Sequence, residues 1–436
     1  MGFDKIVILV LFILTYVMII ALPNHKTWTT GAVALVASVF LIIQGQFKVI
    51  DPIANIKYDV VFMLAGIMLT VGVFAESNMP NLIADKLMSK APSAMVAIVV
   101  VSLLSGIISA FVDNVATVLM LAPIGLSISK KLKVSPIPVL ISIAVSSNLQ
   151  GAATLIGDTT SIMLADAVGM SFFDFFFFNG KFSIFWVVEA GALATVLVLI
   201  VIFRKEKQKL VYQSEEIKIT SIIPTVILIV NMGLLVCSSF VDINITLFGK
   251  TITNGVICLV CGVVALVVYC ITQKCKPNGI IKDSFDYQTV LFLVFLFIII
   301  SCVDKVGIIK DLANFLATIG SQNPFLLYTV IVFGSVIISA FIDNIPYVAT
   351  MLPVVAGLSE SFAPGVTIAL YFGLLIGATL GGNITPFGAS ANVVAIGILK
   401  KEGYQAKNSD FFKIGIPFTT VAVLLGYVMV WLIWAL

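Results

Sequence analysis

Histidine is almost absent from this 436-residue chain, which contains only His25, and charged residues make up just 11% of it. About a quarter of the residues of a soluble protein are charged, so this composition excludes an ordinary soluble domain. A single histidine also excludes a catalytic triad or a metal site built on histidines. All six cysteines lie in the second half, and Cys258-x-x-Cys261 has no second ligand pair nearby, so it predicts helix packing rather than a metal site.

Hydrophobic residues, by contrast, make up 60% of the chain, and the mean hydropathy is +1.15. Long apolar segments separated by short polar loops predict an all-α polytopic membrane protein. The first apolar run, residues 6–22, lacks a small-residue cleavage pattern and leads directly into a second apolar segment. We therefore expect it to be the first transmembrane helix rather than a signal peptide.

Two similar stretches lie 230 positions apart: residues 109–114 read SAFVDN and residues 339–344 read SAFIDN. Each copy places a carboxylate and a carboxamide side by side in a long apolar run: Asp113 with Asn114, and Asp343 with Asn344. A charged side chain at the bilayer centre costs about 3 kcal/mol, so such residues indicate a functional site. Matched sites in two halves of a chain are typical of a transporter built from an internal repeat.

Apolar and polar segments follow the same order in both halves. In the first half, residues 1–203, we predict spans at 4–22, 27–43 and 59–76, an interfacial segment at 78–90, a long apolar stretch at about 94–128, a broken span at about 135–166 and a last span at 183–203. A charged linker, residues 204–218, separates the halves. In the second half, residues 219–436, the corresponding segments are 219–240, 250–271, 287–303, 304–320, about 325–357, about 365–399 and 413–434.

The apolar stretches around the two Asp-Asn pairs are each long enough for one span or for a re-entrant hairpin. If both are hairpins, one face of the membrane holds every lysine and arginine except these few: Lys5, Lys48, Lys57, Lys181, Lys250, Lys305 and Lys310. Single spans would scatter the basic clusters over both faces, so the positive-inside rule favours hairpins. Each half then has five spans plus one hairpin, so the halves are inverted repeats and the linker is cytoplasmic. The first hairpin opens from the cytoplasm and the second from outside, and both termini lie outside.

Behind each hairpin lies a segment rich in glycine and threonine: NLQGAATLIGDTTS at residues 148–161 and GGNITPFGASAN at residues 381–392. Both contain G-x-x-T-x-x-G, and glycine together with Pro386 favours unwinding of a helix. Unwound carbonyls and hydroxyls can replace the water shell of a hard cation, while the helix N-termini that follow favour an anion. Close helix packing is the alternative explanation of small residues, but it does not explain why Asp-Asn precedes the motif by about 40 residues in both halves.

These motifs give a set of candidate ion- and substrate-binding residues: Asp113, Asn114, Gly151, Thr154, Gly157, Asp158, Asp343, Asn344, Asn383, Thr385, Gly388 and Asn392. Asp113 and Asp343 are expected to titrate or to balance a cation. The neutral ligands, also the expected ligands of Na⁺, are Asn114, Thr154, Asn344 and Thr385. Asp158 stands where the second break has Ala389, so one ion site is expected to be more acidic. The sequence offers no lysine or arginine inside the membrane as a fixed counter-ion for a dicarboxylate, which favours a cation or a neutral hydroxide as the substrate.

Four blocks resemble a known family: SAFVDNVATV at 109–118, GAATLIGD at 151–158, IDNIPYVATM at 342–351 and LGGNITPFGASANVV at 380–394. They are similar to the ion-transporter superfamily of arsenite permeases, sodium/proton antiporters and citrate-type permeases, above all to its P-protein branch. The sequence differs from the family pattern at Gln150 and at residues 159–161. The resemblance implies a homodimer in which a scaffold holds two mobile transport units.

Together these observations predict a secondary-active transporter, coupled to Na⁺ or H⁺, that moves a small inorganic ion or a small organic anion by alternating access. An antiporter in the plasma (inner) membrane of a prokaryote is expected, with no enzymatic activity, no cofactor besides the coupling ion and no nucleic-acid partner. An arsenite or oxyanion efflux permease is the alternative. An intramembrane aspartyl protease would also use two membrane aspartates, but it needs no duplicated hairpins. A channel would need a ring of carbonyls around one axis, and nothing in the sequence supplies one.

Overall fold

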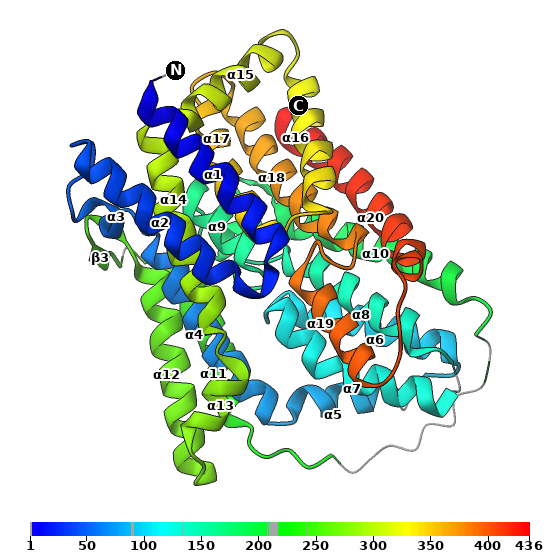
Figure 1. The fold of residues 1–436 in the computed structure, drawn as a ribbon. Helices are drawn as coiled ribbons and strands as arrows, with labels where there is room; N and C mark the ends of the chain where they lie inside the picture. Colours follow the sequence, from blue (N-terminus) through cyan, green and yellow to red (C-terminus); the bar gives the residue numbers. More distant parts are fainter. Residues whose placement is uncertain (1, 89–90, 133, 207, 209–216, 242) are drawn as a thin grey trace.

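The computed structural model of the 436-residue chain describes all residues except 1, 89–90, 133, 207, 209–216 and 242 (Figure 1). Within the described part, the strands form only two short antiparallel hairpins, β1 (Phe177–Phe178) with β2 (Lys181–Phe182) and β3 (Thr246–Leu247) with β4 (Lys250–Thr251). Eight described helices are long and apolar enough to cross a membrane. The predicted fold class, an all-α polytopic membrane protein, is therefore confirmed.

The first half of the chain runs from α1 to the β1–β2 hairpin and α10. Its helices are α1 (Phe3–Ala21), η1 (Pro23–His25), α2 (Lys26–Ile43), α3 (Asp51–Ala54), α4 (Tyr58–Glu76), α5 (Met79–Met88), α6 (Ala94–Ser109), α7 (Asn114–Leu132), α8 (Pro136–Gly151), α9 (Thr159–Val168), η2 (Phe173–Phe175) and α10 (Ile184–Phe203). The predicted linker 204–218 follows α10, and most of it lies outside the described residues.

The second half begins with α11 and ends near the C-terminus. Its helices are α11 (Ile223–Ser238), α12 (Thr253–Gln273), α13 (Pro277–Ser284), α14 (Tyr287–Lys305), α15 (Ile308–Gln322), α16 (Pro324–Ser339), α17 (Asn344–Leu358), α18 (Pro364–Gly381), η3 (Gly382–Ile384), α19 (Ser390–Lys401), α20 (Asn408–Val430) and the π-helical turn η4 (Trp431–Ala435). Helices α6 and α16 each end four residues before the aspartate of an Asp-Asn motif. Helices α7 and α17 each begin at the asparagine of that motif.

Polar side chains and prolines determine where several of these helices begin. The Ser135 hydroxyl accepts a hydrogen bond from the Ile137 amide and Pro136 follows at the first helical position of α8. The Asn323 side chain accepts from the amides of Phe325 and Leu326 at the start of α16. Such caps satisfy amides that have no partner inside the helix, so they fix the starts of the helices that lead into the hairpin and the break.

Contacts between helices are repeated in the two halves. The pair α4–α12 corresponds to α2–α14, α6–α8 to α16–α18, α7–α8 to α17–α18, and α7–α19 to α9–α17, while α10 packs on α20. In Figure 1, α2, α4, α12 and α14 form a column along the left side, and the hairpin and broken helices lie to its right. The molecule thus consists of two intertwined halves that use equivalent contacts.

The crossing of α4 and α12 is unusually close because glycines face each other. A Cβ added to Gly262 would lie 2.5 Å from the Gly66 carbonyl oxygen, and Cys258 is fully buried at the same crossing. Small residues allow such backbone approach in membrane helices. Cys258 and Cys261 are both buried, and among the described residues there is no group of three or more His, Cys, Asp or Glu side chains suited to a metal ion.

Candidate functional site

Each helix break is bonded to the tip of the hairpin in its own half. The Thr154 hydroxyl, in the break between α8 and α9, donates to the Ala110 carbonyl at the tip between α6 and α7. In the second half the Thr385 hydroxyl donates to the Ala340 carbonyl at 2.5 Å. Both threonines are buried. The predicted threonines therefore hold the hairpin tips against the breaks.

A glycine in each break lies among converging backbone oxygens. A Cβ added to Gly157 would lie 2.5 Å from the carbonyl oxygen of Gly151, 2.7 Å from that of Ser109 and 2.9 Å from that of Ala110. A Cβ at Gly388 would lie 2.7 Å from the carbonyl oxygens of both Gly382 and Ser339. No other residue fits either position without moving backbone, so glycine is required here by close approach.

Beside each break lies a buried side-chain oxygen without a hydrogen-bond partner among the described residues. These atoms are the Ser109 hydroxyl in the first half and Asn392 Oδ1 in the second. The Asn392 amide nitrogen donates to the carbonyls of Gly382 and Thr385 at 2.9 and 3.0 Å, which leaves its oxygen free. A buried polar atom without a partner costs free energy, so its persistence points to a ligand.

The two hairpin aspartates cap the helices that follow them. Asp113 Oδ2 accepts from the amides of Val115 and Ala116 at 3.0 and 3.2 Å. Asp343 Oδ1 accepts from the Ile345 amide at 3.3 Å, while its Oδ2 lies 3.0 Å from the Lys26 ammonium. The expectation of no lysine among the spans is therefore wrong, since Lys26 is the first residue of α2 and reaches the site. The only indication of this contact in the sequence is that Lys26 directly precedes the predicted span 27–43.

A chain of asparagines crosses the centre of the molecule. The Asn114 amide donates to Asn148 Oδ1 at 3.0 Å, and the Asn148 amide donates to Asn383 Oδ1 at 3.0 Å and to the Thr379 carbonyl at 2.7 Å. All three asparagines are buried. Asn148 was not among the predicted site residues, although it lies at the start of the first break, and it joins the first hairpin to the second break.

Asp158 connects the first break to the second hairpin. Its Oδ2 accepts from the Thr160 hydroxyl at 2.8 Å and from the Asn344 amide at 3.3 Å. Thr160 in turn lies 3.1 Å from the Thr379 hydroxyl. Asp158, the acidic residue that distinguishes the first break, thus contacts the second half of the chain through Asn344.

Another carboxylate, Glu189, lies within α10 and not at a helix end. Both of its oxygens accept from the Gln150 amide, at 3.0 and 2.8 Å. Gly106 on α6 faces Gln150 so closely that any added side chain would overlap it. The departure from the family pattern at Gln150 is therefore compensated by a carboxylate partner and a facing glycine.

The carboxylates meet in a cavity of about 980 Å³ lined by residues from both halves. The predicted residues Asp113, Asn114, Asp158 and Asp343 line it, together with Lys26, Glu76, Lys282, Asp283 and Asp286. The remaining predicted residues, Gly151, Thr154, Gly157, Asn344, Asn383, Thr385, Gly388 and Asn392, lie around the breaks and tips rather than along this lining. Acidic groups outnumber lysines in this lining, so the cavity favours cations or an anion that arrives with a cation.

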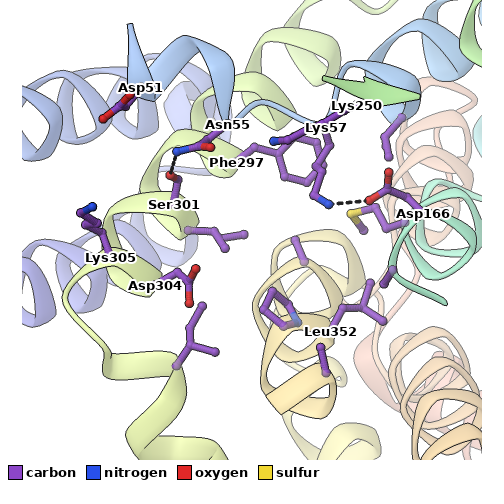
Figure 2. A pocket seen from close by; sticks show the side chains of 18 of the residues that line it. Asp51, Asn55, Lys57, Asp166, Lys250, Phe297, Ser301, Asp304, Lys305 and Leu352 are labelled. Atoms are coloured by element: carbon purple, nitrogen blue, oxygen red, sulfur yellow. Dashed lines mark hydrogen bonds and ion pairs between the residues drawn. The ribbon is translucent and has the colours of Figure 1, made fainter. Parts of the chain in front are cut away.

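A second hollow, of about 430 Å³, lies between α17, the start of α4 and the end of α14 (Figure 2). Lys57 and Asp166 form an ion pair of 2.9 Å across it, and Asn55 donates to the Ser301 hydroxyl at 2.9 Å. Burial lowers the pKa of Lys250, the nearby Lys57 lowers it further, and Asp166 opposes both. This hollow is smaller than the first cavity, and its lining does not include Asp113 or Asp343.

Buried carboxylates, unwound glycine-rich breaks and duplicated hairpins inside an all-α membrane fold define a transporter rather than a soluble enzyme. The sequence profile described as "Citrate transporter" (CitMHS) matches residues 9–375 and 256–436. The chain therefore belongs to the CitMHS citrate transporter family.

Curated relatives agree with this assignment. An uncharacterized transporter of Mycobacterium tuberculosis is 30% identical over 435 residues, covering 98% of each chain. The P protein of Homo sapiens is 24% identical over 486 residues, covering 94% of this chain and 58% of that protein. The resemblance stated from the four sequence blocks is confirmed.

Solved structures show the same fold at low sequence identity. The YdaH transporter of Alcanivorax borkumensis superposes with a TM-score of 0.57 and 13% identity, over 99% of this chain and 98% of that one. MtrF of Neisseria gonorrhoeae gives a TM-score of 0.53 and 13% identity, over 91% and 83%. At this identity the likeness concerns the fold alone.

Proposed function

We propose that this protein is a secondary-active transporter that moves a small organic anion or small inorganic ion by alternating access, coupled to Na⁺ or H⁺. The observation that carries the proposal is the pair of hollows, because each is built from equivalent positions of the two halves. A transporter with two alternating openings needs such a pair around one central site.

The equivalence of the two hollows holds residue by residue. Leu119 and Pro123 of α7 line the larger cavity, and Ala349 and Pro353 of α17, each 230 positions later, line the smaller hollow. The C-terminal half of α4 lines the larger cavity, as the C-terminal half of α14 lines the smaller one. In the proposed cycle, the larger cavity is one vestibule and the smaller hollow is its counterpart on the opposite side.

The breaks supply the chemistry of a cation site. Backbone carbonyls converge at Gly157 and Gly388, and the unpartnered Ser109 hydroxyl and Asn392 Oδ1 add side-chain oxygens. An all-oxygen set suits a hard cation such as Na⁺. Thr154 and Thr385 contribute by fixing the tips, and Asp113 faces the cavity as the group that takes up a proton or balances the cation.

The substrate is best sought among small carboxylates. The family description names citrate, and Lys282 provides an ammonium group in an otherwise acidic cavity. An anion entering this cavity needs a compensating cation, which is consistent with coupled uptake or exchange. An oxyanion such as arsenite or phosphate is the alternative cargo that the same experiment tests.

We also propose the inverted topology, with the larger cavity open to the cytoplasm. Lys282 and Asn81 lie on its lining, on the side to which the positive-inside rule assigns the basic clusters. The homodimer and the location in the plasma membrane of a prokaryote are proposals that rest on the family resemblance.

Uptake into proteoliposomes tests the function. The purified protein is assayed with labelled citrate, phosphate, arsenite and ²²Na⁺ under an imposed pH gradient, an imposed Na⁺ gradient, or neither. We expect flux of one cargo to be driven by one of the two gradients and to exceed that of empty liposomes. Equal flux with and without both gradients would contradict coupling, and no flux of any cargo would contradict the proposed substrate classes.

A further inference from the structure

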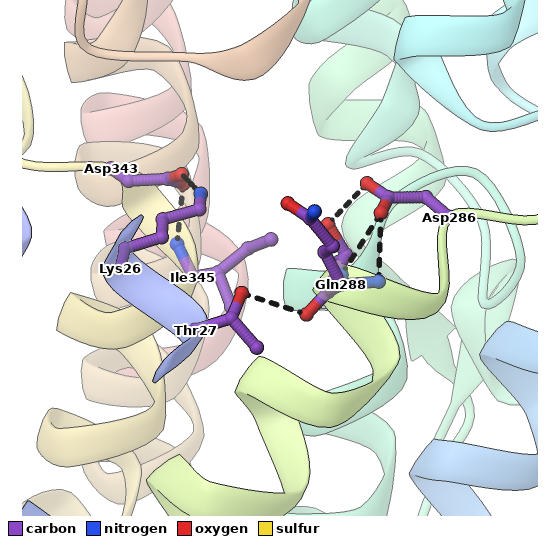
Figure 3. Close-up of polar contacts among 7 residues, drawn as sticks. Lys26, Thr27, Asp286, Gln288, Asp343 and Ile345 are labelled. Atoms are coloured by element: carbon purple, nitrogen blue, oxygen red, sulfur yellow. Dashed lines mark hydrogen bonds and ion pairs between the residues drawn. The ribbon is translucent and has the colours of Figure 1, made fainter. Parts of the chain in front are cut away.

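Lys26 places an ammonium inside the vestibule, directly on the second hairpin. Its Nζ lies 3.0 Å from Asp343 Oδ2, and the two side chains are 28% and 16% exposed. Figure 3 shows the lysine of α2 and the aspartate at the tip of the second hairpin pointing toward each other. The pair joins two elements 317 positions apart in the sequence.

Several contacts hold Lys26 in this position. The adjacent Thr27 hydroxyl donates to the Gln288 carbonyl at 3.1 Å, which fixes the start of α2 against α14. The Lys26 ammonium also lies 5.1 Å from the centre of the Phe292 ring, a favourable cation–π arrangement. The lysine is therefore a built part of the site and not a solvated surface side chain.

The neighbouring Asp286 does not compete for Lys26, because its carboxylate caps α14. Its Oδ1 accepts from the amides of Gln288 and Thr289 at 3.0 and 3.1 Å, and its Oδ2 accepts from the Thr289 hydroxyl at 2.6 Å. Asp343 uses only one backbone amide, that of Ile345. Asp343 is thus the carboxylate whose charge Lys26 neutralises.

The first hairpin has no such lysine. Asp113 occupies the equivalent position and faces the same cavity, yet among the described residues no ammonium lies within ion-pair distance of it. Its carboxylate accepts hydrogen bonds from the amides of Val115 and Ala116. The two copies of one motif therefore differ in their counter-charge.

We propose that Lys26 is the resident counter-ion of the second hairpin, so that its ammonium occupies the cation position at Asp343. Only the first hairpin then takes a free monovalent cation or a proton from the vestibule, at Asp113. This inference rests on the proposed function, because the number of coupling ions bound by the two hairpins matters only in a coupled transporter. It assigns one mobile cation, not two, to the hairpin carboxylates.

The other charged and titratable groups near the pair do not replace Lys26. Asp286 faces it from α14, Asp158 approaches through Asn344, and Asp113 lies on the same cavity. Tyr16 of α1 reaches the start of α17, where its hydroxyl lies 2.7 Å from that of Thr350 and donates to the Pro346 carbonyl. None of these groups is a cation.

Chemical labelling of carboxyl groups tests the proposal without any transported substrate. Dicyclohexylcarbodiimide is an apolar reagent that adds to protonated carboxyls, and mass spectrometry locates the adducts in the purified full chain at acidic pH without Na⁺. In the wild type we expect labelling of Asp113 but not of Asp343. Lys26→Gln removes the ammonium and should raise labelling of Asp343 by about tenfold or more, because the Asp343 carboxyl then has no ion-pair partner and is open to the reagent.

Two further variants serve as controls. Lys26→Arg keeps the charge and should retain the wild-type pattern. Lys282→Gln removes another lysine of the same cavity and should leave Asp343 unlabelled, whereas a general loss of folding would raise labelling of Asp113 as well. Equal labelling of Asp113 and Asp343 in the wild type, or no increase at Asp343 in Lys26→Gln, overturns the proposal. A wild-type protein without ion flux would remove the proposed function and leave the labelling result standing.

Discussion

Asp113 and Asp343 show how neighbours determine what a residue does. Both terminate a hairpin tip and cap the next helix through backbone amides. A carboxylate that only caps a helix can be replaced by asparagine, which is also a good cap. A carboxylate that exchanges a proton or a cation cannot, because the amide does not ionise. The same substitution therefore separates a structural role from a coupling role.

Asp113→Asn is expected to give folded protein that no longer responds to a pH gradient. The amide keeps the size of the side chain and an oxygen for the amides of Val115 and Ala116, but the site loses its titrating group. Flux against imposed pH gradients in proteoliposomes measures this. Glu360→Gln, at an exposed carboxylate away from the cavity, is the matched control and should behave as wild type. A normal gradient response of Asp113→Asn would leave only the capping role.

Gly157→Ala and Gly388→Ala are expected to abolish transport. The added methyl would lie within 3 Å of backbone oxygens that cannot move without displacing the hairpin tip, as shown by distances of 2.5 and 2.7 Å at Gly157. Overpacking of this kind costs about 1–3 kcal/mol. Flux is measured together with the amount of protein in the membrane fraction, which should stay normal.

Gly397→Ala in α19 is the control for these variants. A Cβ at Gly397 meets no atom within 4 Å, so this variant should transport normally. Full transport by Gly157→Ala would mean that the converging carbonyls have no role in the cycle.

At the scale of elements, the hydrogen-bonded asparagines connect the first half of the molecule to the second. Asn148 sits at the end of α8 and contacts the first hairpin through Asn114 and the second break through Asn383 and Thr379. Asn148 is therefore one of the buried side chains that join the two halves. Buried networks of this type act as a unit, since a missing member leaves its partners unsatisfied.

Asn148→Ala is expected to lower stability by about 1–3 kcal/mol, because the buried amide of Asn114 and the oxygen of Asn383 each lose a partner. Thermal unfolding of the detergent-solubilised protein measures the change, and flux is measured in parallel. Asn408→Ala, at an exposed asparagine at the start of α20, is the matched control. An unchanged unfolding temperature for Asn148→Ala would show that the chain of asparagines is not a stabilising network.

The helices of this fold could be predicted from the sequence more fully than the contacts between them. Apolar length predicted the spans 27–43 and 59–76, which coincide with α2 and α4 to within one residue. Contacts between residues distant in sequence could not be predicted: Lys26 lies 317 positions from Asp343, and Glu189 lies 39 positions from its partner Gln150. Partners so distant in sequence follow from packing, which periodicity does not encode.

At the scale of the whole molecule, the two halves are predicted to be inverted in the bilayer. Cysteines introduced at Lys131 and Ser359, just beyond equivalent hairpins, should then react with an impermeant maleimide from opposite sides of the membrane. The exposed native cysteines, Cys237 and Cys275, are first replaced by serine. Reaction of both positions from the same side would exclude the inverted arrangement.

The two hollows are expected to open alternately. Leu119 lines the larger cavity and is 49% exposed, whereas Ala349, at the equivalent position of the second half, lines the smaller hollow and is 4% exposed. In the resting protein, a cysteine at Leu119 should react with an impermeant maleimide from the cytoplasmic side, and a cysteine at Ala349 should be protected.

Substrate together with its coupling gradient should shift both reactivities in opposite directions, because in the proposed cycle one vestibule closes as the other opens, and the two halves share their contacts. A ligand shifts this equilibrium only by its differential affinity for the two states, so a poor substrate should shift both reactivities less, and by the same fraction. The cysteine at position 359 lies at the surface and should show no change, which controls for reagent access. If substrate changed the reactivity of one hollow and left the other as it was, the hollows would not be two phases of one cycle, and the cavity at Asp113 would have to work as a site open to one side only.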